Sequence, residues 1–117
     1  MAHAGTEIKC AEILKTNAAF NVAADSSIAT GTTYSVEAKN KNIILAVVPN
    51  TAGTLTIKKG EGFAAVKDID IAITASKVNW IELDTTPFLR FDGDDKGYIV
   101  VATDSTLAGK MHVVSAL

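Results

Sequence analysis

The sequence predicts an all-β domain, a single antiparallel β-sandwich or jelly roll of about eight strands. Val, Ile and Thr together make up 34 of the 117 residues, and these β-branched side chains favour the pleated surface of a sheet over a helix. Short apolar or alternating segments recur at spacings near ten residues, with turn residues between them, and no segment shows an amphipathic helical period. An open β-barrel is the alternative architecture.

The length of the chain predicts one domain, which is large enough to bury its own core. We assign residues 17–117 to the sandwich and residues 1–16 to an N-terminal arm. The apolar positions of the arm, among them Ile8, Ile13 and Leu14, fit neither a strand nor a helix period. Three interpretations are open: a mobile terminus, a short edge strand, or a segment ordered only against another subunit.

Two segments are apolar on both faces, which predicts central strands covered on both sides. The first is 98–102, which we expect to form a β-hairpin with residues 88–91 across the turn at 92–97. The second is 43–48, which we expect to end at Pro49 because proline cannot donate a hydrogen bond to the ladder.

The other predicted strands alternate between apolar and polar residues, as half-buried strands do. Trp80 shares one face of its strand with Val78, opposite Ile81 and Leu83. We expect either that Trp80 or Ile81 lies at a subunit contact, or that a loop covers the outer face. The predicted alternating strands are 20–24, 33–38, 54–58 with Leu55 and Ile57 inward, 68–74, 78–83 and 111–115 with Met111 and Val113 on one face.

Composition argues against several partners. The net charge is −2 and the eleven Lys and Arg residues are scattered, so no basic stripe is available for nucleic acid. The longest apolar run, 43–48, is far shorter than a membrane helix requires. The first residues lack a signal-peptide pattern, and the single Cys10 excludes an internal disulfide and fits a reducing compartment. We therefore expect a soluble protein with an unpaired thiol, made inside the cell.

No catalytic motif is present in the sequence. His3 and His112 stand in no metal-ligand spacing and near no nucleophile with an orienting carboxylate, and no phosphate-binding loop occurs. Asp92, Asp94 and Asp95 could hold Ca²⁺ with backbone oxygens, but an Asp-Gly pair between two strands is more typical of a hairpin turn. We expect no enzyme activity, no catalytic residue, no cofactor and no metal site.

The second half of the chain resembles a known family of virus proteins. The residues that carry the resemblance are 51–62, 66–69, 81–83, 90–91 and 96–101. In this pattern of strand and turn residues the chain is similar to the small head decoration, or cement, proteins encoded beside the major capsid protein of tailed phages.

The resemblance implies a structural role. The protein would bind the outside of an icosahedral capsid as a trimer, with the major capsid protein as its partner, and would be located on the virion surface. The candidate capsid or subunit contacts are Ile8, Ile13, Leu14 and Trp80. Two alternatives remain: another virion component, such as a tail or neck protein, or a carbohydrate-binding module. A carbohydrate-binding module would require Trp80 and Tyr34 to be exposed side by side.

Overall fold

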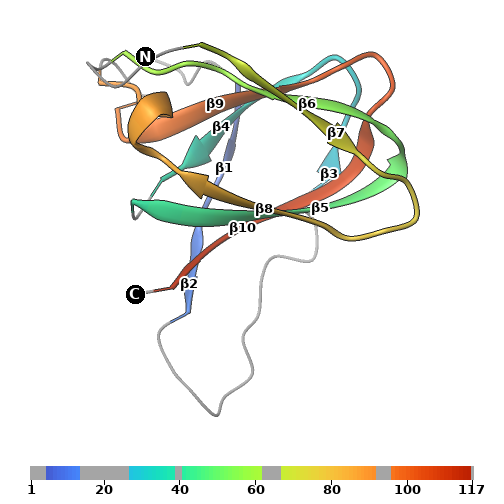
Figure 1. Ribbon diagram of the computed structural model, residues 1–117, viewed down its shortest axis with the longest axis horizontal. Helices are drawn as coiled ribbons and strands as arrows, with labels where there is room; N and C mark the ends of the chain where they lie inside the picture. Colours follow the sequence, from blue (N-terminus) through green and yellow to red (C-terminus); the bar gives the residue numbers. More distant parts are fainter. Residues whose placement is uncertain (1–4, 14–26, 39–40, 62–66, 92–95, 117) are drawn as a thin grey trace.

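The protein is a β-sandwich of two stacked sheets (Figure 1). The computed structural model describes residues 5–13, 27–38, 41–61, 67–91 and 96–116. Sheet A has the strand order β1 (Thr6–Ile8), β4 (Thr33–Glu37), β9 (Tyr98–Thr103), β6 (Gly53–Ile57) and β7 (Ile69–Ile73). Sheet B has the order β2 (Ala11–Ile13), β10 (Ala108–Ala116), β5 (Asn42–Thr51) and β8 (Asn79–Asp84), and β3 (Ser27–Ile28) also pairs with β10. The predicted fold class is confirmed.

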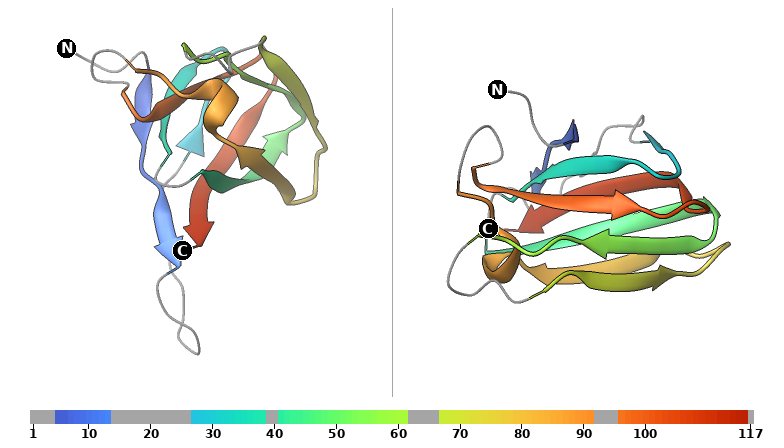
Figure 2. Two further views of the ribbon diagram at one scale, coloured as in Figure 1. Left: turned by 60° about the vertical axis from the view of Figure 1, so that its left-hand side comes forward. Right: turned by 90° about the horizontal axis from the view of Figure 1, so that it is seen from above.

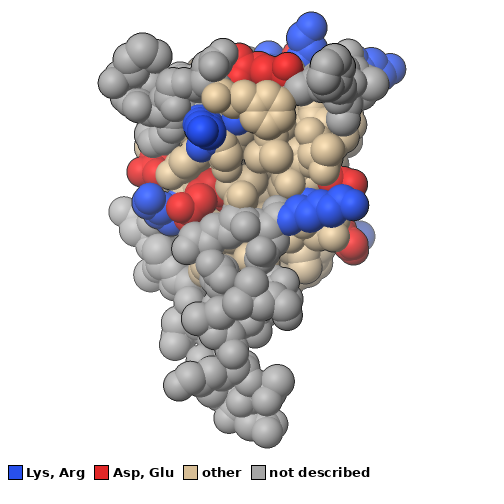
Figure 3. Space-filling view, turned by 90° about the vertical axis from the view of Figure 1, so that its left-hand side faces the viewer, with Lys and Arg blue, Asp and Glu red and all other residues tan. Residues whose placement is uncertain are grey.

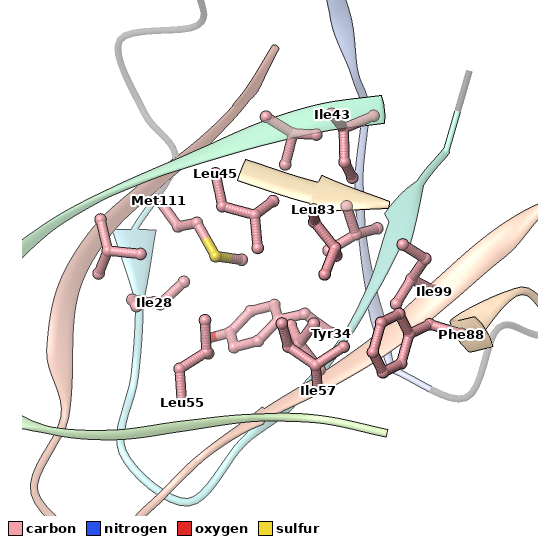
Figure 4. Packing of buried hydrophobic residues seen from close by; sticks show 14 of the residues in the cluster. Ile28, Tyr34, Ile43, Leu45, Leu55, Ile57, Leu83, Phe88, Ile99 and Met111 are labelled. Carbon is pink, nitrogen blue, oxygen red and sulfur yellow. The ribbon is translucent and has the colours of Figure 1, made fainter. Parts of the chain in front are cut away.

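The core lies between the two sheets and is built from alternate residues of their strands (Figure 4). Leu55 and Ile57 point inward from sheet A, and Leu45 and Met111 meet them from sheet B; all four side chains are fully buried. Burying one such side chain stabilises the fold by about 1.5–3 kcal/mol. The predicted inward positions of β6 are therefore confirmed, and of the two faces predicted for β10 the one with Met111 and Val113 points into the core.

The predicted central strand at 98–102 is also confirmed. The strand β9 lies between β4 and β6 in the middle of sheet A, with Ile99 and Val101 buried in the core and Val100 buried on the opposite face. An apolar residue at every position is the pattern that burial on both faces requires.

The prediction for β5 was wrong in two respects. The strand does not stop at Pro49 but continues to Thr51, because Pro49 faces Gly109 at an irregularity in the pairing of β5 with β10. A bulge of this kind is one of the few places where a sheet accepts proline. The second error concerns burial: Ile44 and Val48 are 37% and 38% exposed, so the outer face of β5 is not fully covered.

The predicted first arm of the hairpin, residues 88–91, is not a strand. Thr86–Phe88 forms a short 3₁₀ helix, η1, with Pro87 in its first turn, where the fixed φ of proline is favourable. Of this segment only Arg90 bridges to the region before β9: its amide donates to Tyr98 O over 3.0 Å, and its carbonyl accepts from Gly97 over 2.9 Å.

The described part of the N-terminal arm consists of edge strands of both sheets (Figure 2). The strand β1 pairs in parallel with β4, and β2 pairs in parallel with β10. Residues 6–13 thus run from one sheet to the other along one side of the sandwich. Between them Cys10 is only 6% exposed, and its Sγ lies 3.5 Å from the Ser115 hydroxyl.

The turn before β10 is organised by Asp104. Its Oδ1 accepts hydrogen bonds from the amides of Thr106 and Leu107 at 2.9 and 2.8 Å, and its Oδ2 accepts one from Thr54 at 2.9 Å. These hydrogen bonds favour the ionised form and lower the pKa of Asp104 to about 2. The carboxylate therefore joins β6 to the turn between β9 and β10.

The strand predicted at 20–24 lies outside the described residues, and so do the acidic residues Asp92, Asp94 and Asp95.

Candidate functional site

The outer face of sheet B carries a group of apolar side chains, which we call the Trp80 face: Ile44, Ala46, Val48, Val78 and Trp80. Ala46 is buried, and the other four are exposed. Trp80 is 68% exposed and Val78 is 49% exposed. Among the described residues, six large hydrophobic side chains are exposed, and four of them belong to this face. Apolar side chains gathered in this way are typical of interaction surfaces, whereas scattered ones are not.

The alternation of β8 places Trp80 on this face. Leu83 is buried and Ile81 packs against the core, so Trp80 and Glu82, which alternate with them along the strand, point away from it. Ala46 of β5 pairs directly with Trp80, and paired residues of an antiparallel ladder lie on the same face. The small Ala46 side chain is only 5% exposed.

Charged side chains stand at the margins of the Trp80 face. Glu82 of β8 and Lys110 of β10 are both exposed, and His112, two residues from Lys110 on β10, is partly buried. The register gives these positions: Ile44 pairs with Glu82, Ala46 with His112, and Val48 with Lys110. The centre is therefore apolar and the margin polar, as in protein–protein interfaces.

Elsewhere, positive and negative side chains are interspersed. Figure 3 shows both signs around a largely uncharged area on another side of the molecule. The described part of that view has no extended surface of a single sign.

A polar cluster attaches the N-terminal segment to sheet A. The Tyr98 hydroxyl donates to Glu7, and Lys9 Nζ lies 3.1 Å from Glu7 Oε2 and 3.8 Å from Glu37 Oε2. The Cys10 amide donates to Glu37 Oε1 over 3.0 Å. The hydrogen bonds to Glu7 raise the pKa of both Lys9 and Tyr98. This cluster holds the chain where it passes from sheet A to sheet B.

The structure separates the four candidate contact residues. Trp80 is exposed on the outer face of sheet B, whereas Ile8 is partly buried and packs against the core. Ile13 belongs to β2 at the edge of sheet B, and Leu14 lies outside the described residues. Of the four, Trp80 is the side chain whose described environment suits a contact with another molecule.

Sequence reasoning missed Ile44, Val48 and Val78 as surface residues. The alternation of this strand predicts that Val78 shares a face with Trp80, and that shared face was a signal that Val78 is exposed. Ile44 and Val48 belong to an uninterrupted apolar run, and such a run does not distinguish a face covered by the same chain from one open to a partner.

Tyr34, the second aromatic residue that a carbohydrate-binding surface would need, is not beside Trp80. It is 4% exposed, within the core (Figure 4), and its hydroxyl accepts a hydrogen bond from the Ala29 amide over 2.7 Å. A flat pair of exposed aromatic rings is therefore not formed by these two residues.

A search of the described residues finds no group of three His, Cys, Asp or Glu side chains that could hold a metal ion. It also finds no helix long and apolar enough to span a membrane. Comparison with known proteins gives no match to any family model, curated protein or solved structure.

Proposed function

We propose that this protein is a non-enzymatic structural component of a virus particle that binds the outside of a tailed-phage capsid and stabilises it. Its partner is then the major capsid protein, and its location is the surface of the virion. The proposal joins the family resemblance of residues 51–101 to the character of the molecular surface.

The observation that carries the proposal is the Trp80 face. A tryptophan that is 68% exposed beside other exposed apolar side chains is unfavourable in water and is favourable once another protein covers it. Arrays of decoration proteins depend on contacts of this kind, between copies or with the shell.

The rigidity of the sandwich also suits a structural protein that binds without changing its conformation. The core is continuous across both sheets, and one side is closed by residues 6–13. A binder whose surface is fixed before binding loses little conformational entropy when it docks.

The test is a pelleting assay with capsids assembled from the major capsid protein of the same source. We expect saturable binding with a fixed number of copies at each local symmetry position, and capsids that resist heating better when the sites are filled. Absence of binding at saturating protein would refute the decoration role.

The same preparation addresses the two alternatives. Extended rings or tubes in electron micrographs of the purified protein would indicate a tail or neck component, since open assemblies arise from head-to-tail contacts. A change in Trp80 fluorescence on addition of glycans, without capsid binding, would indicate a carbohydrate-binding module.

A further inference from the structure

The Trp80 face has a regular layout that the strand register defines. Its three strands are β8, β5 and β10, with β5 in the middle. The central row across the sheet is Trp80, Ala46 and His112. Ala46 is therefore the centre of the face, one strand away from both of its row partners.

Two opposite charges occupy opposite corners of this layout. Glu82 follows Trp80 by two residues on β8, and Lys110 precedes His112 by two residues on β10. Because β8 and β10 both run antiparallel to β5, these offsets place Glu82 beside Ile44 at one end of β5 and Lys110 beside Val48 at the other. The midpoint between the two charges is Ala46.

The two charges are too far apart to pair within one molecule. Across the sheet they are two strand spacings of about 4.8 Å apart, and along the strands they are four residues of about 3.4 Å apart. Together these offsets separate the two positions by roughly 16 Å. No ion pair joins either side chain to another described residue. Both charges are therefore available to a molecule that covers the face.

This layout is self-complementary. A second copy can be placed on this face by a rotation of half a turn. The rotation axis passes above Ala46, lies parallel to the sheet in the contact plane, and is perpendicular to the line from Glu82 to Lys110. Glu82 of each copy then meets Lys110 of the other, and Trp80 of each lies over the region of Val48 of the other. One symmetric contact thus covers the apolar centre and pairs both charges, as an isologous interface requires.

We propose that the occupant of the Trp80 face is a second copy of this chain, packed sheet against sheet about a two-fold axis. From the same spacings, the strands of the two copies would cross at roughly 70°, nearer to the orthogonal than to the aligned class of sheet packing. The inference does not depend on capsid binding, and it differs from the trimer that the family resemblance implies.

The size of the face sets the strength of the contact. Three strands of about six residues cover roughly 15 by 20 Å, which is well below the roughly 800 Å² that each partner contributes to a stable complex. We therefore expect a weak dimer, with a dissociation constant on the order of 100 μM or higher. Copies held close together on a larger assembly would pair more readily, because their effective concentration is higher.

Sedimentation velocity over a concentration series that reaches about ten times this dissociation constant tests the proposal. The wild-type protein is expected to pass from monomer to dimer. Glu82→Lys and Lys110→Glu each place two pairs of like charges across the contact, and each is expected to weaken the dimer at least tenfold. The double variant E82K/K110E restores opposite charges and is expected to recover the wild-type constant within about threefold.

Lys67→Glu is the matched control, because it changes the net charge as Lys110→Glu does but lies away from the Trp80 face; it should leave the dimer unchanged. Circular dichroism establishes that each variant is folded. A wild-type protein that stays monomeric over the whole range, one that forms trimers, or a double variant as weak as either single one would overturn the proposal. The pelleting assay has a separate readout, capsid binding, so failure of the dimer proposal and failure of the decoration proposal can be told apart.

Discussion

Replacing Gly109 by alanine is expected to destabilise the protein strongly, because of the way β10 enters its pairing with β5. Gly109 has φ = 152°, in a region that side chains of L-residues rarely adopt. A Cβ atom at this position would lie 2.3 Å from the Val48 carbonyl oxygen and 2.7 Å from the Pro49 Cα. Both are backbone atoms, so relief requires β5 and β10 to separate at the bulge.

The size of the effect follows from two contributions. The unfavourable backbone conformation costs about 1–3 kcal/mol, and the forced displacement of two paired strands adds about 1–3 kcal/mol, as overpacking does. We therefore expect G109A to lose about 3 kcal/mol or more of its free energy of unfolding. At about 4 °C per kcal/mol for a domain of this size, the melting temperature should fall by about 12 °C.

Gly97→Ala is the matched control. Gly97 also has positive φ, 79°, but a Cβ there would meet no atom within 4 Å. The left-handed conformation costs alanine about 1–2 kcal/mol, and the loss of freedom in the unfolded chain offsets about 0.4–1 kcal/mol of that. The net loss should be about 1 kcal/mol or less.

Urea unfolding followed by far-ultraviolet circular dichroism measures both variants. This signal is preferable to fluorescence, since Trp80 is already largely exposed in the folded state. If G109A lost no more stability than G97A, the close approach of β10 to β5 at the bulge would be refuted.

Three further predictions concern single side chains. Trp80→Thr should change the free energy of unfolding by less than about 1 kcal/mol, whereas Leu83→Ala on the same strand should cost about 2–5 kcal/mol in the same urea titration; equal losses would contradict the assignment of the two faces. The folded pKa of Asp104 is about 2, below its ordinary 3.8, so the stability it contributes is complete above 3.8 and lost as the pH falls toward 2. The stability difference between wild type and Asp104→Asn should therefore shrink over that range; a constant difference would contradict the hydrogen bonding of the carboxylate. Glu7→Gln should lower the raised pKa of Tyr98, measured by ultraviolet absorbance during an alkaline titration, and an unchanged titration would show that the two side chains do not interact in solution.

Local alternation was sufficient to predict the core strands. Leu55 and Ile57 of β6 were assigned to the core, and Met111 and Val113 of β10 to one face, by their spacing alone, because successive side chains of a strand point to opposite faces. These assignments needed no knowledge of which strands are neighbours.

Features that depend on neighbouring strands could not be predicted in this way. The continuation of β5 through Pro49 depends on the bulge at Gly109, sixty residues later in the sequence. The exposure of Ile44 and Val48 depends on whether another element covers sheet B, and their hydrophobicity does not reveal it. The single Trp80 was recognised, but the face around it could be assembled only from the register of three strands.

The N-terminal edge strands have a consequence for folding kinetics. The thiol of Cys10 lies beside the hydroxyl of Ser115, at a sequence separation of 105 residues. The strand β2 pairs with the last three residues of β10 at a similar separation. Closing so long a loop has a large entropic barrier, and contacts of this kind slow folding. We therefore expect residues 11–13 to be the last to dock during refolding, so that Cys10 remains reactive toward thiol reagents until the two sheets have assembled.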